Sequence, residues 1–330
     1  MTSFDTCLIL GQQTDMRTEF QGPGDSLGEN FGEIPGSNGA AAFRAVCPDP
    51  SPVPVVLAVP HAGREYPQAL TVMMRNPGLV AVRLEDRYVD KLASAAAEDT
   101  GAALLVACAP RAMVDLNRSP EDIDPEMIEG LAPGRPKRSA GLRMHSGLGV
   151  VPRRLPGLGE IWNRRIDAAS LQSRIAQIHG PYHTMLDTIL RRLRDRWGAA
   201  LLLDVHSMPP LPARLSGASS PKIVLGDRFG ASSAGSLVAA AFNHLAGEGM
   251  AVAHNRPYAG GYVLERHASP SDGIHAIQVE ICRSLYLDSR LSEPSAECST
   301  VSRLLSGLVR CLAAEVSAMG QGSKWGLAAE

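Results

Sequence analysis

The sequence predicts a single α/β domain built on a mixed, mostly parallel sheet that is flanked by helices. Two runs, residues 53–59 and 199–205, are almost wholly apolar, and each breaks into polar residues at its end. This composition is typical of strands that are buried on both faces, as in parallel sheets covered by helices. Strand-like runs also alternate with segments of helical periodicity, an order that favours crossover connections. Since no repeat or linker divides the core, we expect one domain.

The expected strands are short apolar runs bounded by glycine, proline or polar residues. They comprise residues 53–59, 102–108, 199–205, 223–225, 250–254 and 276–282. The expected helices carry apolar residues at three- and four-residue spacing. They comprise residues 84–97, residues 170–178, a segment with the stripe Leu186, Leu190, Leu193 and Trp197, residues 232–245 and residues 294–318. Gly101 and Gly198 follow two of these helices, where glycine commonly ends a helix.

Three segments lie outside the expected elements. Residues 1–45 are rich in Gly, Ser, Asn and acids and show no periodicity, which predicts a mobile arm with one short strand. Residues 130–160 are rich in Gly, Pro and Arg, and a loop of this length is expected to be a functional cover or partly disordered. A frayed tail is expected at residues 319–330, so the folded domain is predicted to span residues 46–318.

Composition and charge narrow the classes of partner. Of the 330 residues 45% are hydrophobic, and the net charge of −2 gives no general attraction to nucleic acid or to an anionic membrane. No apolar run reaches the roughly 20 residues of a membrane helix. The N-terminus lacks a basic region, and the six cysteines are scattered without a CxxC pair. We therefore expect a cytoplasmic protein with a small-molecule partner, while the oligomeric state is not predicted.

Two histidines stand at the ends of the two most apolar strands. His61 follows residues 53–59 and His206 follows residues 199–205. A lone loop histidine usually bonds to backbone, but two at matching strand ends indicate a shared metal, because zinc hydrolases commonly use three protein ligands. The third ligand stays open at this point, since Glu65, Glu85 and Asp86 all lie nearby in sequence.

Two acids accompany these histidines. Asp204 lies two residues before His206 on the same strand face and could orient its ring. Glu280 lies within an apolar strand, where an unpaired carboxylate is costly to bury. It is therefore either paired, for example with Arg283, or a site carboxylate with a raised pKa that is suited to acid–base work.

Arginines are concentrated in the expected loops, and they indicate an anionic substrate. Arg111, Arg118 and Arg256 could bind carboxylates in a bidentate manner, although surface pairing explains each one equally well. The possible partners in such pairs are Asp115, Asp122 and Asp124. Gly260 and Gly261 permit a close approach of the backbone to a ligand, or a tight turn. The absence of P-loop, GxGxxG, GxSxG and HExxH motifs weakens the nucleotide, serine-hydrolase and zincin interpretations.

Seven ordered motifs resemble the N-formylglutamate amidohydrolase family over about residues 50–290. They are PHAG at 60–63, DRYVDKL at 86–92, RAMVDLNR at 111–118, GPYH at 180–183, LLLDVHSMP at 201–209, NRPYAGGYVLERH at 255–267 and AIQVEICRSLYLD at 276–288. The resemblance implies a fold similar to that of zinc carboxypeptidases and aspartoacylase, with one zinc ion per chain.

The resemblance also implies roles for individual residues. His61 and His206 match the metal histidines, and an acid stands in the family where Asp86 stands here, so Asp86 is preferred over Glu65 as the third ligand. Arg64 stands where the carboxypeptidase relatives have their acid, three residues after the first histidine. Asn117 and Arg118 resemble the pair that holds a substrate carboxylate, and Glu280 matches the glutamate that activates water.

The implied activity is hydrolysis of N-formyl-L-glutamate to formate and L-glutamate, a step in histidine breakdown. Arg111 would stabilise the oxyanion, while Arg118 and Arg256 would bind the carboxylates of the substrate, with Gly260 and Gly261 beside it. Two alternatives remain at this point. One is a zinc amidohydrolase or carboxypeptidase that acts on another N-acyl amino acid or a short peptide. The other is a protein that binds zinc or an acidic ligand without catalysis.

Overall fold

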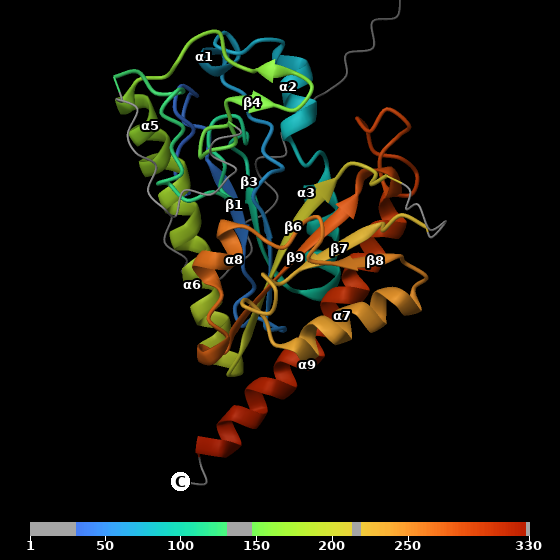
Figure 1. Ribbon diagram of the computed structural model, residues 1–330. Coiled ribbons are helices and arrows are strands. Elements are labelled where there is room, and N and C mark those ends of the chain that lie inside the picture. The colour runs from blue at the N-terminus through green and yellow to red at the C-terminus, as the bar shows by residue number, and fades with distance from the viewer. Residues whose placement is uncertain (1–30, 131–146, 213–218, 328–330) are drawn as a thin grey trace, which may run out of the picture.

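A computed structural model describes residues 31–130, 147–212 and 219–327. In this part of the chain a seven-stranded sheet has the order β1-β3-β2-β6-β9-β7-β8 (Figure 1). Its strands are β1 (Phe43–Val46), β2 (Val55–Val59), β3 (Ala103–Ala107), β6 (Ala200–Met208), β7 (Ile223–Gly226), β8 (Val252–His254) and β9 (Ile274–Cys282). The strands β3, β2, β6 and β9 run parallel to one another, and β7 runs parallel to β8. Because only β1 with β3 and β7 with β9 pair antiparallel, the predicted mixed, mostly parallel sheet is confirmed.

The three central strands β2, β6 and β9 are buried along their whole length. Their side chains alternate between two apolar layers, because successive residues of a strand point to opposite faces. Ala58 and Leu202 belong to one layer, whereas Leu57 and Leu203 belong to the other. Burial on both faces explains why the sequence of these strands is continuously apolar rather than alternating.

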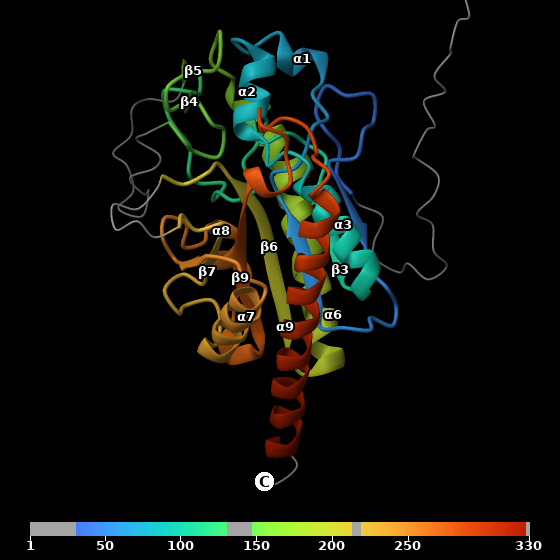
Figure 2. The ribbon, with the colours of Figure 1, turned by 90° about the vertical axis from the view of Figure 1, so that its right-hand side faces the viewer.

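Helices cover both faces of the sheet. One face is covered by α3 (Val89–Thr100), α7 (Gly235–Gly247) and α9 (Cys298–Leu327), and α9 packs against both α3 and α7 (Figure 2). The other face carries α6 (Gly180–Trp197), which continues from α5 (Ala168–Arg174) through a π-helical turn, η1 (Ile175–His179). The short helix α8 (Tyr262–His267) contacts β9.

Short elements that the sequence pattern did not predict follow β2 and precede α5. They are α1 (Gln68–Thr71), α2 (Pro77–Leu84) and the hairpin of β4 (Arg154–Leu155) and β5 (Gly159–Glu160), all at the carboxyl end of the central strands (Figure 1). The helix expected at residues 84–97 begins instead at Val89. The chain leaves the helical conformation at Glu85, and the backbone N–H of Asp86 donates to the carbonyl oxygen of His61 at 2.9 Å. This bond fixes Asp86 beside the end of β2.

The domain extends beyond the predicted boundaries at both ends. Ile34, Ala42 and Phe43 are buried, and β1 adds an edge strand to the sheet, so the arm predicted for residues 1–45 is wrong for residues 31–45. The one short strand expected in that segment agrees with β1, whereas the burial of Ile34 and Ala42 was not expected, because glycines and acids dilute the apolar side chains there. Residues 1–30 lie outside the described residues.

The last helix also differs from its prediction. α9 begins at Cys298 and continues to Leu327, so the fraying expected from residue 319 is wrong for the helical part of that segment. Gly320 lies so close to the preceding chain that a Cβ atom there would stand 2.1 Å from the carbonyl oxygen of Trp197. This close packing holds the helix against the start of β6. No helix in the described part of the chain is long and apolar enough to cross a membrane.

Candidate active site

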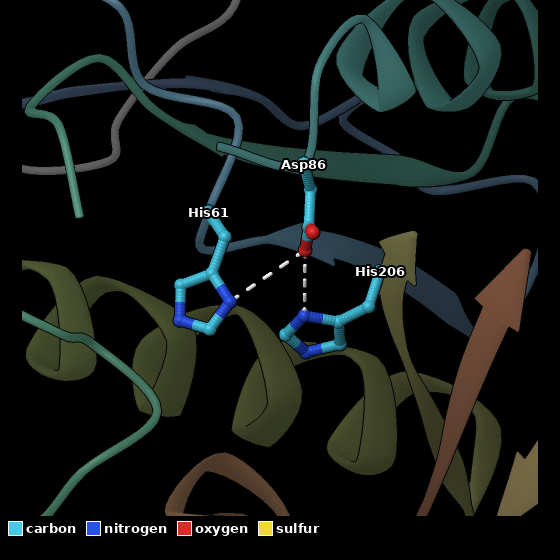
Figure 3. Close-up of side chains that lie close together, drawn as sticks. All are labelled: His61, Asp86 and His206. Atoms are coloured by element: carbon cyan, nitrogen blue, oxygen red, sulfur yellow. Dashed lines mark hydrogen bonds and ion pairs between the residues drawn. The ribbon is translucent and has the colours of Figure 1, made fainter. Parts of the chain in front are cut away.

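Three side chains from separate segments meet at the carboxyl edge of the sheet. His61 follows β2, Asp86 lies between α2 and α3, and His206 lies near the end of β6 (Figure 3). Asp86 Oδ2 lies 3.0 Å from His206 Nδ1 and 3.5 Å from His61 Nδ1. All three residues are buried, and one ligand atom from each lies within 4.8 Å of the other two. A tetrahedral metal with ligand bonds of about 2.0–2.2 Å needs ligand atoms roughly 3.4 Å apart, so the set fits a divalent ion.

The outer nitrogens of both imidazoles are held by carboxylates. His61 Nε2 lies 2.7 Å from Asp115 Oδ1, and His206 Nε2 lies 2.9 Å from Asp204 Oδ2. Since a carboxylate accepts, each Nε2 is the donor, and both Nδ1 atoms can present their lone pair to a metal. The role predicted for Asp204 as the acid that orients a ligand ring agrees with this contact.

The third candidate ligand, Asp86, is also oriented by its neighbours. Ser207 Oγ donates to Asp86 Oδ1 at 3.2 Å, and an Nη2 of Arg283 lies 3.4 Å from the same oxygen. Oδ2 is left to face the two histidines. Of the other candidates, Glu65 is exposed and Glu85 is paired with Arg87 at 2.9 Å, so neither joins the described cluster.

The electrostatics favour a cation between these groups. Burial would raise the pKa of Asp86, but the hydrogen bonds from His206 and His61 outweigh it and hold that pKa well below its ordinary value. Burial likewise opposes the charged form of His206, yet Asp204 and Asp86 raise its pKa well above the usual range. A raised pKa favours protonation of His206, so a metal at Nδ1 would compete with a proton for that nitrogen.

Glu280 stands beside His206 on the neighbouring strand. The two residues are Cα partners in the parallel pairing of β6 with β9, and their side chains therefore share one face of the sheet. Burial raises the pKa of Glu280 to about 7, opposed by the charge of His206 and supported by that of Asp86. Gln278 Nε2 donates to Glu280 Oε1 at 2.9 Å. The carboxylate is thus held next to the candidate metal ligands with a pKa suited to proton transfer near neutrality.

Arg283 was one predicted partner for Glu280, but it lies in a different network. Its Nε donates to Ser207 Oγ at 3.0 Å and its Nη1 to the carbonyl oxygen of Val82 at 3.2 Å. Its Nη2 contacts the backbone carbonyl oxygen of Glu85 and the carboxylate oxygen Oδ1 of Asp86. Arg283 therefore supports the metal-ligand segment rather than neutralising Glu280.

A cavity of about 320 Å³ opens onto these residues and contains most of the predicted site. Its lining comprises His61, Arg83, Asp86, Arg111, Asn117, Arg118, Leu148, His206, Ser207, Pro209, Pro257, Tyr258, Ala259, Gly260, Gly261, Gln278, Glu280 and Arg283. Arg256 is exposed and does not belong to this lining, although its neighbours in sequence do. The segment expected to form a cover is described only in part, because residues 131–146 lie outside the described residues.

Asp115 connects the metal site to the residues expected to bind substrate. Besides His61, its carboxylate accepts from Arg111 Nε at 3.0 Å and from the backbone N–H of Asn117 at 2.9 Å. Arg118 Nε lies 3.9 Å from the same carboxylate. Sequence reasoning treated Asp115 only as a possible partner of the arginines. Its contact with His61 spans 54 residues, and no local pattern indicates such a contact.

The paired glycines line the cavity and also pack closely against other parts of the protein. A Cβ atom on Gly261 would lie 2.4 Å from Asn117 Oδ1, and a Cβ on Gly260, whose φ is +107°, would lie 2.6 Å from Leu264. Asn117 Oδ1 accepts from the backbone N–H of Val263 at 2.9 Å. The glycines therefore let the loop before α8 close onto Asn117, which forms part of the cavity wall.

The GPYH motif lies behind this wall. The buried His183 donates through Nε2 to the carbonyl oxygen of Leu116 at 3.0 Å, and His179 donates to that of Arg118 at 2.9 Å. His267 Nε2 lies 2.9 Å from His183 Nδ1 and completes the chain of imidazoles. These hydrogen bonds hold the backbone carbonyl groups of Leu116 and Arg118, the residues before and after Asn117, on the side away from the cavity.

Comparison with known proteins agrees with these observations. The family model for N-formylglutamate amidohydrolase matches residues 53–287. The N-formylglutamate deformylase of Pseudomonas aeruginosa is 28% identical over 250 residues, covering 72% of this chain and 84% of that protein. The deformylase of Pseudomonas putida is 28% identical over 242 residues, covering 72% and 82%.

A solved structure resembles the fold over nearly its whole length. The crystal structure of N-formylglutamate amidohydrolase from Ralstonia eutropha has a TM-score of 0.75 and 29% identity, covering 84% of this chain and 99% of that one. The matched region of the family model includes His61, Asp86, His206 and Glu280. Since that model matches most of the sequence, the chain belongs to the N-formylglutamate amidohydrolase family.

Proposed function

We propose that this protein is a zinc-dependent hydrolase that converts N-formyl-L-glutamate to formate and L-glutamate, a step in histidine degradation. The observation that carries the proposal is the cluster of His61, Asp86 and His206 beside the buried Glu280, at the base of a cavity rich in arginine. The relatives named N-formylglutamate deformylase support the choice of substrate.

His61, Asp86 and His206 would hold the zinc ion, which when bound supplies Lewis-acid activation of water and of the formyl carbonyl. Glu280 takes a proton from the attacking water and passes it to the nitrogen of the departing amine. The water oxygen bonds to the formyl carbon, the C–N bond breaks, and formate and glutamate leave. The raised pKa of Glu280, about 7, suits a group that must both accept and return a proton.

The arginines and Asn117 would hold the substrate in place. Arg111 is fixed by two contacts to Asp115, at 3.0 and 2.9 Å, and would stabilise the negative charge that develops on the carbonyl oxygen. Arg118 follows Asn117 at the cavity wall and would bind the α-carboxylate. Arg256, which was also expected to bind a carboxylate, lies outside the lining of the cavity.

Formate release from a panel of substrates tests the proposal. N-formyl-L-glutamate is compared with N-acetyl-L-glutamate and with dipeptides, using zinc-loaded protein and detecting formate, acetate and free amino acid separately. We expect the formyl compound to have the highest kcat/KM. Faster cleavage of an acetyl or peptide bond would reassign the substrate, and no cleavage by zinc-loaded protein would contradict the hydrolase function.

A further inference from the structure

We propose that Arg83 is a specificity-determining residue, which binds the side-chain carboxylate of the substrate and makes the cavity selective for dicarboxylic N-acyl amino acids. The inference rests on the proposed function and names its substrate class. No motif in the sequence singled out Arg83, and its assignment comes from the charges of the cavity.

Four arginines line the cavity, and three of them are engaged by the site itself. Arg111 pairs with Asp115 at 2.9 Å, and Arg118 Nε lies 3.9 Å from the same carboxylate. Arg283 is buried and directs its guanidinium at Ser207, Asp86 and backbone carbonyls. Each of these three guanidinium groups therefore has a carboxylate of the site, Asp115 or Asp86, beside it.

Arg83 differs from the other three in its surroundings. It lies in the last turn of α2, it is exposed while lining the cavity, and within the described residues it makes no ion pair or side-chain hydrogen bond. A cavity-lining residue that is also exposed must stand where the cavity meets solvent. Among the arginines of the described lining, Arg83 is the one with no protein carboxylate beside its guanidinium, which leaves that group available to an incoming anion.

The backbone around Arg83 is nevertheless fixed. Arg283 donates to the carbonyl oxygen of Val82 at 3.2 Å and contacts that of Glu85, and these residues lie on either side of Arg83. Three residues further on, the backbone N–H of Asp86 is bonded to His61. The segment that supplies a metal ligand therefore also holds Arg83 at a set position relative to the metal site.

The charge of the substrate requires such a group. N-formylglutamate carries two carboxylates, and the cavity already contains the carboxyl groups of Asp86 and Glu280. With Arg118 on the α-carboxylate and Arg111 at the carbonyl oxygen, the second carboxylate of the substrate needs another cation. A guanidinium suits it because its planar N–H groups bind a carboxylate in a bidentate manner.

Kinetics with two nearly isosteric substrates test this role. Wild-type protein, Arg83→Gln and Arg83→Lys are compared on N-formyl-L-glutamate and on N-formyl-L-glutamine, whose side chain has the same shape without the charge. We expect wild type to prefer the glutamate, and Arg83→Gln to raise KM for the glutamate about tenfold without changing kcat. KM for the glutamine should stay the same. Arg83→Lys should recover part of the loss, since it keeps the charge but not the bidentate geometry.

Control variants separate this role from a general effect of charge. Arg310→Gln removes an arginine of α9 that pairs with Asp99 at 2.6 Å, away from the cavity, and should leave both substrates unaffected. The proposal is overturned if wild type does not prefer the glutamate, or if Arg83→Gln affects both substrates equally. A selective loss in Arg256→Gln with none in Arg83→Gln would also overturn it.

Product binding distinguishes a failure of this inference from a failure of the proposed function. If wild type releases formate from neither substrate, the hydrolase function fails first. Calorimetric binding of L-glutamate and L-glutamine to zinc-loaded protein then still tests Arg83. The inference predicts that Arg83→Gln weakens binding of L-glutamate alone, and equal binding of L-glutamate by wild type and variant would contradict it.

Discussion

The substitution Asp115→Asn should weaken metal binding although Asp115 is not a metal ligand. Asp115 is 1% exposed, and its carboxylate accepts from His61, Arg111 and the backbone N–H of Asn117. Asparagine has the same shape but carries N–H groups on one side. If the oxygen of its amide faces His61, its N–H groups face those of Arg111. If the amide is turned, its N–H groups face His61 Nε2 and force the ring proton onto Nδ1, the nitrogen that must bind the metal.

The expected magnitude follows from these contacts. Loss of a carboxylate that orients a metal-bound histidine typically reduces metal affinity 10–100-fold, about 1.4–2.7 kcal/mol. The variant also removes the charge opposite Arg111, and breaking a buried ion pair costs about 3–5 kcal/mol. Because the side chain of Arg111 is 23% exposed, water compensates in part, and we expect a loss of unfolding free energy nearer 2–3 kcal/mol.

Two assays on the same protein check this prediction. Zinc affinity is measured by competition with a chromophoric chelator, and the free energy of unfolding of the metal-free protein is measured in urea. Asp195→Asn is the matched control, because that carboxylate is exposed and pairs with the adjacent Arg194 at 2.6 Å. Unchanged zinc affinity in Asp115→Asn would refute the assignment of Asp115 as the residue that orients His61.

Three further predictions concern Glu280 and the cavity wall. Glu280→Gln should lower kcat about 10²–10⁴-fold while zinc content, measured by atomic absorption, stays at the wild-type level; a parallel loss of zinc would show that Glu280 acts as a ligand instead. Burial raises the pKa of Glu280 to about 7, and a bound cation would move that pKa to 7 or below. Because Glu280 must be ionised to act as the base, kcat/KM should fall as the pH falls through this pKa. A pH profile that stays flat down to pH 4.5 would contradict this. Gly261→Ala places a Cβ atom 2.4 Å from Asn117 Oδ1, so it should raise KM and lower the free energy of unfolding by about 1–3 kcal/mol. Unchanged kinetics and an unchanged thermal unfolding temperature would show that the loop moves to accommodate the methyl group without cost.

The part of the site that was predictable from sequence stands at the ends of buried strands. His61, His206 and Glu280 each interrupt or follow an apolar run, and the pairing of β2, β6 and β9 brings them to one edge of the sheet. The fold class was also predictable, because alternating strands and helices favour parallel pairing of the strands. The antiparallel direction of β7 was not predictable, because a strand's direction depends on its connections and not on its composition.

The rest of the site depends on contacts between distant segments. Spacing left Asp86, Glu65 and Glu85 equivalent, and the bond from the backbone of Asp86 to His61 is what distinguishes them. Arg256 and Arg83 are both exposed arginines near loops, so the sequence could not show that, of these two, Arg83 lines the cavity and Arg256 does not. Asp115 was missed as a partner of His61 because an aspartate among arginines suggests surface pairing, whereas here it is buried between His61 and two arginines.

Formate release before and after metal exchange tests the central claim most directly. Purified protein is treated with a chelator, assayed on N-formyl-L-glutamate, and titrated with zinc alongside His206→Ala. We expect that chelation abolishes formate release, that activity returns and saturates at one zinc ion per chain, and that His206→Ala recovers none of it. Full activity in chelated protein, or recovery in His206→Ala equal to that of wild type, would contradict a metal-dependent reaction at this site.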